Sequence, residues 1–204
     1  MSRRVHAYCC FSLCVVRQPS TGCWLAVQET PKHNCEWWLP AGSVDPGESF
    51  PEAAHRETLE EAGLAIRLLG VLRVQHECLS PEAGYRMRVV FYGEPLEDGA
   101  PLKSVADAES TQARWCSTAE LAGMQSEGVL RGDDLLNWAE YLEKGGAIFP
   151  LSVFGAECAG PGDPAEAAAS AGSSGQGGGA AASASADLLH PPWASATLKD
   201  FQLQ

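Results

Sequence analysis

The sequence predicts an α/β domain, because short strand-like apolar runs alternate with helical segments over the first 150 residues. The strand-like runs are bounded by turn-forming residues, and one helix has clear start and stop residues. The expected strands span residues 7–17, 23–29, 37–40, 66–77, 86–92 and 112–116, and the expected helices span 50–62 and 132–144.

The strands are predicted from composition and alternation. The first two are joined by the turn-prone run Gln18–Gly22, and a polar loop, Thr30–Cys35, leads to the short strand Trp37–Pro40. In the strand 86–92, alternate residues fall on opposite faces. We therefore expect one apolar face and one face with both arginines, the two sets being Met87, Val89, Phe91 and Arg86, Arg88, Val90.

The helix 50–62 has capping residues at both ends. Ser49 is in the N-cap position with Glu52 three residues later, which is a capping box, and Pro51 lies in the first turn. Gly63 ends the helix. This segment is the best-defined element of the sequence.

Composition and charge limit the function. The chain has 204 residues, 45% of them hydrophobic, with six Trp and six Phe, which is enough for a folded core. A net charge of -12 argues against binding to nucleic acid polymers or membrane surfaces. A small phosphorylated ligand remains compatible with this charge if divalent cations screen the carboxylates.

The domain is predicted to span residues 1–150, followed by a flexible Ala/Gly/Ser-rich linker at 151–186 and a tail at 187–204. The tail regains large apolar residues and is read either as a docking segment or as a loose end.

Arg3-Arg4 and the apolar run after them resemble a weak targeting signal, but we interpret the run as the first strand. A cytoplasmic location is expected, with an organelle as the alternative. The eight cysteines contain no CxxC pair, so we expect free thiols and no structural zinc.

Three glutamates on the first helix indicate chemistry. Glu57, Glu60 and Glu61 are at positions i, i+3 and i+4 and share one helix face, where like charges repel. Such a cluster is reasonable if a cation lies among the carboxylates, and oxygen ligands favour Mg²⁺ or Mn²⁺ over zinc. The glutamates taken alone are also compatible with a solvated acidic helix.

The segment from residue 42 to residue 64 resembles the Nudix box, GX5EX7REUXEEXGU, where U is a bulky aliphatic residue. The matching residues are Gly42, Glu48, Arg56, Glu57, Glu60, Glu61, Gly63 and Leu64, and Thr58 departs from an aliphatic position. The resemblance covers about residues 5–150. It implies an αβα sandwich with a mixed central sheet and a catalytic loop-helix-loop, and magnesium-dependent hydrolysis of a phosphoanhydride bond.

The resemblance also implies roles for individual residues. Glu57, Glu60 and Glu61 match the metal-binding glutamates, and the Gly42 carbonyl matches a backbone ligand. Glu48 and Arg56 match a pair that is mainly structural, in which the arginine orients the glutamates.

Two residues outside the box are further candidates. The proton of the attacking water is expected to go to a box glutamate or to Glu109, which the sequence alone also allows to be an exposed loop charge. Arg88 is a candidate phosphate contact or an ordinary surface arginine.

The substrate is less well defined than the reaction. The run Ala106–Trp115 resembles the eukaryotic Nudix branch that hydrolyses 8-oxo-dGDP and related oxidised purine nucleotides. Asp133 and Asp134 resemble acidic residues that read a purine base, but either one can instead cap the second helix. Trp38, like its neighbour Trp37, can stack on a base or belong to the core.

Other functions stay open at this level. ADP-ribose and dinucleoside polyphosphates are alternative substrates, and a non-catalytic nucleotide-binding module of the same fold is the alternative from another class. The expected partner is a small-molecule nucleotide, with no nucleic acid polymer and no membrane. The oligomeric state is not predicted.

Overall fold

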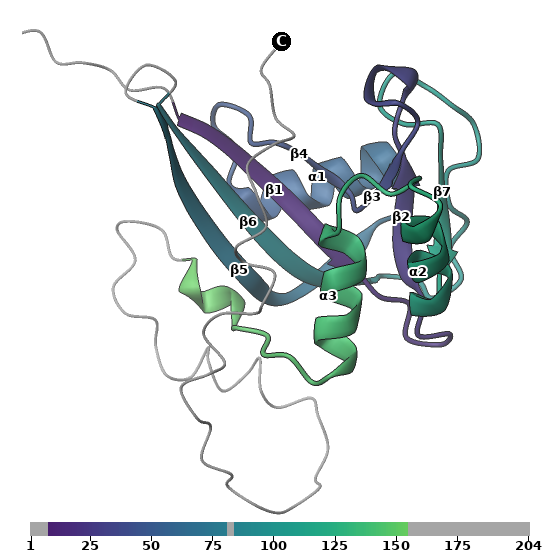
Figure 1. Cartoon of the computed structure of the whole chain (residues 1–204). Helices are drawn as coiled ribbons and strands as arrows, with labels where there is room; N and C mark the ends of the chain where they lie inside the picture. Colours follow the sequence, from purple (N-terminus) through teal and green to yellow (C-terminus); the bar gives the residue numbers. More distant parts are fainter. Residues whose placement is uncertain (1–7, 81–83, 155–204) are drawn as a thin grey trace, which may run out of the picture. The chain divides into compact units, whose positions relative to one another are not determined.

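A computed structural model describes residues 8–80 and 84–154 of the chain (Figure 1). The strands of this part are β1 Tyr8–Val16, β2 Trp24–Gln28, β3 Trp37–Trp38, β4 Ala41–Ser43, β5 Ile66–Ser80, β6 Gly84–Pro95 and β7 Gln112–Cys116. The helices are α1 Phe50–Ala62, α2 Thr118–Ser126 and α3 Asp134–Glu143, with short 3-10 helices at Pro31–His33 and Leu151–Val153.

The strands form two sheets, one of four strands in the order β4-β1-β6-β5 and one of three in the order β3-β2-β7. The larger sheet is mixed, because β1 pairs with β6 in parallel and with β4 in antiparallel register. The long β5 and β6 pair in antiparallel fashion. The α/β class and the mixed sheet predicted from the sequence are confirmed.

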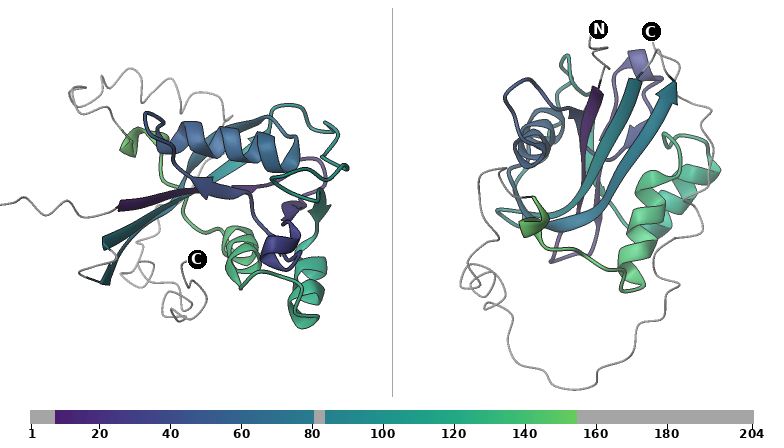
Figure 2. Two further views of the ribbon diagram at one scale, coloured as in Figure 1. Left: turned by 90° about the horizontal axis from the view of Figure 1, so that it is seen from above. Right: turned by 90° about the vertical axis from the view of Figure 1, so that its left-hand side faces the viewer.

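The helices lie on both sides of the larger sheet. Helix α1 lies along one side, and α2 and α3 lie on the opposite side (Figure 2). This layering explains the burial of β6: Val89, Val90 and Phe91 are all buried. Val90, which alternation places on the same face as Arg86 and Arg88, is thus buried as well.

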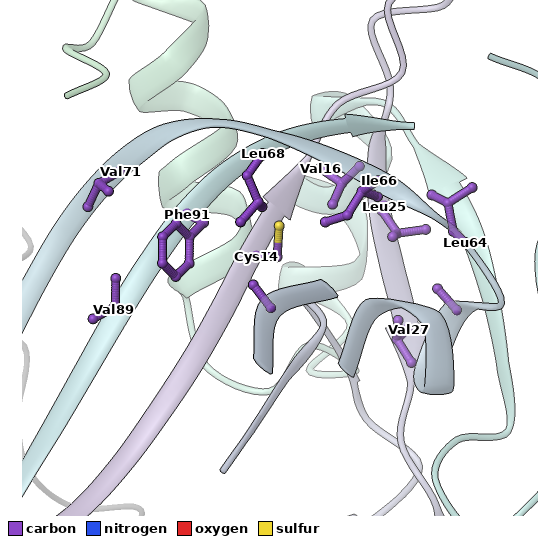
Figure 3. Close-up of a cluster of buried hydrophobic side chains, with 12 residues drawn as sticks. Cys14, Val16, Leu25, Val27, Leu64, Ile66, Leu68, Val71, Val89 and Phe91 are labelled. Carbon is purple, nitrogen blue, oxygen red and sulfur yellow. The ribbon is translucent and has the colours of Figure 1, made fainter. Parts of the chain in front are cut away.

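The core below α1 fixes the position of that helix. Apolar side chains from β1, β2, β5 and β6 gather there, among them Cys14, Val27 and Phe91 (Figure 3). Thr58, the one departure from the Nudix box, is fully buried in α1, and its hydroxyl donates to the Ala54 carbonyl at 2.7 Å. The polar atom is thus satisfied, and a residue of aliphatic volume fills the aliphatic position.

One α-helix and one strand, besides the two short 3-10 helices, were not expected from the sequence. Helix α2 begins with its own capping box, in which the Ser117 hydroxyl accepts from the Glu120 backbone N–H. Strand β4 is only three residues long and is defined by its pairing with β1. Helix α3 begins at Asp134, later than the predicted residue 132.

The packed domain continues past the expected boundary at residue 150. Leu151 and Phe154 pack against the core, and the Phe154 ring lies 6.1 Å from that of Phe50 and 5.6 Å from that of Phe91. The linker predicted from residue 151 therefore overlaps the domain up to Phe154. The remaining linker, the tail and Arg3-Arg4 lie outside the described residues. Within residues 8–80 and 84–154, no helix has the length and apolar character needed to cross a membrane.

Candidate functional site

Helix α1 carries the predicted site and begins and ends where the sequence predicts. The Ser49 hydroxyl accepts from the Glu52 N–H at 3.4 Å, and the Glu52 carboxylate accepts from the Ser49 N–H at 2.8 Å. Gly63 has a φ of 67° in the left-handed region, and its N–H donates to the Leu59 carbonyl. The glutamates are therefore fixed on a helix with defined ends.

Arg56 joins the loop before α1 to the glutamates on it. Its Nε and Nη2 each donate to one oxygen of Glu48 at 2.8 Å, and Nη2 also donates to the Ser43 carbonyl. Its Nη1 donates to Glu57 at 2.7 Å and to Glu60 at 3.0 Å. The bond to Glu48 and those to the other two glutamates raise the pKa of Arg56, so the guanidinium stays charged.

Gly42 allows the closest approach of the backbone to a glutamate. A Cβ at this residue would lie 2.0 Å from Glu57 Oε1, so any side chain there would displace the carboxylate. Burial raises the pKa of Glu57, while the hydrogen bond from Arg56 lowers it. The carboxylate of Glu57 is thus enclosed between the strand that carries Gly42 and the guanidinium of Arg56.

Glu61 is the most strongly perturbed acid in this part of the chain. It accepts a hydrogen bond from the Ala41 N–H at 3.1 Å. Burial and, to a lesser extent, the negative charges of Glu57, Glu29 and Glu109 together raise its pKa to about 8, against the lowering effect of the Ala41 bond. Glu61 therefore holds a proton over a pH range in which an exposed glutamate is ionised.

Glu109 lies near the α1 carboxylates although it is far away in the sequence. Its charge contributes to the raised pKa of both Glu57 and Glu61. The loop that carries it is attached to α1 by a hydrogen bond of 2.6 Å from the Ser110 hydroxyl to the Glu61 carbonyl. The fold thus brings the acidic loop residue to the acidic helix.

The donor set suits a hard divalent cation. Every candidate ligand is an oxygen, and burial opposes the charge on Glu57 and Glu61 unless a proton or a cation neutralises it. Oε2 of Glu29, the residue after β2, is buried without a hydrogen-bond partner among the described residues. Two of the candidate ligands, Glu57 and Glu60, bond to Arg56. Within the described ranges, no three His, Cys, Asp or Glu side chains lie in an arrangement that could hold a metal ion as they stand.

A second cluster surrounds Trp38. Two guanidinium groups lie over its ring, that of Arg131 at 4.4 Å from the centroid and that of Arg88 at 5.9 Å. Arg88 also pairs with Asp134 at 3.2 Å, and Arg131 pairs with Glu29. Trp38 is buried, and its Nε1 has no hydrogen-bond acceptor in the described part of the chain.

Asp133 is separated from this cluster. It occupies the N-cap position of α3, but its side chain makes no capping hydrogen bond and instead accepts from the Gln125 amide. Asp134 is the first residue of the helix and pairs with Arg88. Side-chain capping, the alternative considered for these two residues, is thus not observed for Asp133.

Four residues around these clusters were not selected as site candidates from the sequence. Glu29 and Arg131 have no local motif, because they meet only when the segment that precedes α3 pairs with Trp37 of β3, the strand next to β2. Lys103 and Ser110 lie in the loop before β7 and contact carbonyl groups of α1. Ser110 belongs to the run Ala106–Trp115, whose resemblance concerned the substrate, and no local pattern links Lys103 or Ser110 to α1.

Known proteins show similarity to this chain at several levels. The NUDIX domain model matches residues 11–139. The mouse 8-oxo-dGDP phosphatase NUDT18 is 36% identical over 118 residues, which cover 57% of this chain and 33% of that protein. The phosphatase NudJ of Escherichia coli is 32% identical over 108 residues, which cover 53% of this chain and 67% of that protein.

Solved structures agree with the fold. A NUDIX hydrolase from Nitrosomonas europaea has a TM-score of 0.58 and 24% sequence identity, over 74% of this chain and 97% of that one. At this identity the likeness concerns the fold alone. The matched region spans about a third of the mouse phosphatase.

Proposed function

The chain belongs to the NUDIX domain family, and from this premise we propose that it hydrolyses a phosphoanhydride bond of a nucleoside diphosphate derivative with the help of a divalent cation. One observation carries the proposal: the buried carboxylate of Glu57, which lies against the backbone of Gly42, and the partly buried carboxylate of Glu61 lie close to Glu109. Grouped acids with raised pKa values are typical of functional sites.

The cation is proposed to be Mg²⁺, with Mn²⁺ as a substitute, held by Glu57, Glu60 and Glu61 and by the backbone carbonyl of Gly42. When bound, it neutralises phosphate charge and makes a water molecule more acidic. Hard oxygen donors select these ions over softer metals.

The side chains of this protein have distinct tasks in the proposed reaction. Arg56 limits the motion of Glu57 and Glu60 by bonding to both. Glu109 or a glutamate of α1 accepts the proton of the attacking water. Arg88, which is partly buried beside Trp38, contributes positive charge for a phosphate group.

We propose an oxidised purine nucleotide such as 8-oxo-dGDP as the substrate. The mouse and human relatives named 8-oxo-dGDP phosphatase support this choice, as does the cluster of Trp38, Arg88 and Asp134. A flat purine ring can stack on the planar guanidinium groups that lie over the buried Trp38 ring, and the carboxylate of Asp134 can accept hydrogen bonds from a purine edge.

The test compares 8-oxo-dGDP, dGDP, 8-oxo-dGTP, ADP-ribose and a dinucleoside polyphosphate at equal concentration, with Mg²⁺ and with EDTA. We expect phosphate release that needs the cation and is fastest with 8-oxo-dGDP. Glu60→Gln and Glu61→Gln should remain folded and lose turnover by about two orders of magnitude or more.

Each outcome has a separate meaning. Equal rates for 8-oxo-dGDP and dGDP reject the proposed substrate, and a preference for ADP-ribose or a dinucleoside polyphosphate replaces it. Full activity in both glutamine variants rejects the metal site. Nucleotide binding without any cation-dependent cleavage would make the domain a binding module.

A further inference from the structure

The loop between β6 and β7 caps the C-terminal end of α1. The last carbonyl groups of a helix have no partner inside it and need one from elsewhere. Lys103 Nζ donates to the carbonyl of Glu60 at 2.8 Å, and the Ser110 hydroxyl donates to that of Glu61 at 2.6 Å. The backbone N–H of Lys103 donates to the carbonyl of Ala62 at 2.9 Å. One loop therefore satisfies three consecutive carbonyls, and the lysine charge complements the helix dipole.

Asp107 organises this loop. Its Oδ1 accepts from Lys103 Nζ, from the Glu109 N–H at 2.9 Å and from the Ser110 N–H at 3.2 Å, and its own N–H donates to the Ser110 carbonyl at 3.0 Å. These bonds from Lys103 and from the two backbone groups lower the pKa of Asp107 to about 2, so the carboxylate stays ionised at neutral pH. The turn that presents Glu109 is thus built around one charged side chain.

The loop is also anchored on its other side. The Thr111 N–H donates to the Gln28 carbonyl at 2.8 Å, and the Thr111 hydroxyl donates to the Glu29 carbonyl at 3.0 Å. Ser110 is fully buried between this anchor and α1. The backbone of Glu109 is therefore held between α1 and the C-terminal end of β2.

We propose that Lys103, Asp107 and Ser110 form a clamp that positions Glu109 beside the carboxylates of α1 for proton transfer. The inference rests on the proposed function, and Asp107 is its central positioning residue. Asp107 acts through Glu109, because its carboxylate bonds directly to the Glu109 N–H. Displacement of a reacting group by about 1 Å can cost about 100-fold in rate, which gives such a clamp a measurable effect.

The experiment measures kcat and KM of the full chain for 8-oxo-dGDP, or for the best substrate of the panel, with Mg²⁺. Asp107→Ala removes every bond of the carboxylate and should lower kcat about 10- to 100-fold, with KM changed less than about threefold. Asp107→Asn keeps the oxygen that accepts from both N–H groups and should recover most of the loss. Asp98→Ala is the matched control, since Asp98 lies near the start of the same loop but accepts its bonds from Ser20 of the turn between β1 and β2, and it should leave kcat unchanged.

A double variant tests whether Asp107 acts through Glu109. Glu109→Gln should lower kcat on its own, and adding Asp107→Ala should cause no further loss. Wild-type kcat in Asp107→Ala or in Glu109→Gln would overturn the clamp, and so would losses that multiply in the double variant.

Amide hydrogen exchange, measured by NMR without added cation, gives a readout independent of turnover. The N–H groups of Glu109 and Ser110 should exchange at least about tenfold faster in Asp107→Ala and at an unchanged rate in Asp98→Ala. Unchanged exchange in Asp107→Ala would overturn the clamp while leaving the proposed function intact. A wild-type protein without cation-dependent turnover would instead overturn the proposed function, and with it the catalytic role of the clamp.

Discussion

At the scale of single residues, the site is unusual in the free energy needed to ionise its carboxylates. Glu57 and Glu61 are acids with raised pKa values, placed close to each other and to Glu109. Burial and repulsion both favour the protonated form, and only a hydrogen bond from Ala41 offsets them at Glu61. The site therefore carries a free-energy cost that the proposed cation would relieve.

This cost predicts a pH-dependent stability in the absence of a cation. The pKa of Glu61 is raised from 4.5 to about 8, so the folded state binds its proton more tightly than the unfolded state. The stabilising contribution is complete below pH 4.5 and is lost as the pH rises through about 8. In EDTA, the free energy of unfolding should fall over this window in the wild type and fall less in Glu61→Gln.

Urea unfolding at several pH values measures the effect. Glu127→Gln, a change on the exposed end of α2, serves as the control and should follow the wild-type curve. Addition of Mg²⁺ should flatten the wild-type curve, because the cation stabilises the ionised carboxylates. Parallel curves for the wild type and Glu61→Gln would contradict this account of Glu61.

At the scale of elements, α1 and the loops at its two ends act as one unit. Arg56 joins the preceding loop to the helix through Glu48, and the loop that carries Glu109 caps the other end. The core below α1 holds the whole unit against the sheet. The glutamates are therefore placed by contacts from three separate segments.

Arg56→Lys tests this arrangement. A lysine keeps the charge but cannot provide the planar set of donors that reaches Glu48, Glu57 and Glu60 at once. We expect turnover to fall about 10- to 100-fold, by analogy with the loss of groups that orient metal ligands. Arg67→Lys, at an exposed arginine whose side chain lies 3.6 Å from Glu94, should have no effect. Equal turnover in both variants would reject the orienting role of Arg56.

At the scale of the whole molecule, the domain closes on itself through residues after α3. Phe149 forms a β-bridge with Val71, and Leu151 and Phe154 pack on the core. The end of the folded unit is thus set by packing and not by the change in composition.

Two truncations distinguish these boundaries. A chain ending at residue 154 should unfold at about the same temperature as the full chain. A chain ending at residue 150 should lose about 2 kcal/mol of its free energy of unfolding, because the truncation exposes apolar surface around Phe50 and Phe91. Differential scanning calorimetry of both chains measures the difference. Equal melting temperatures for the two truncations would show that residues 151–154 contribute nothing to the fold.

Much of this fold was predictable because its signals are local. The capping box at Ser49 and the glycine at position 63 define α1 to the residue, since caps depend on neighbours a few positions away. Strand β7 also has its predicted bounds. The spacing of Glu57, Glu60 and Glu61 placed three carboxylates on one helix before any tertiary contact was known.

Some local signals were nonetheless missed or misleading. The capping box at Ser117 marks α2 as clearly as Ser49 marks α1, yet no strong apolar periodicity follows it along that short helix. Val90 shares a face of β6 with two arginines, and only the tertiary structure shows that it is buried there.

The sequence by itself determined the family, the mixed α/β class and the helix that carries the glutamates, because these follow from patterns within a few turns of chain. Only the tertiary structure brought Glu109 to α1, Arg131 to Trp38 and Lys103 to the end of the helix. Those contacts join residues that are far apart in sequence. Their positions depend on how sheets and loops pack, which short-range patterns do not encode.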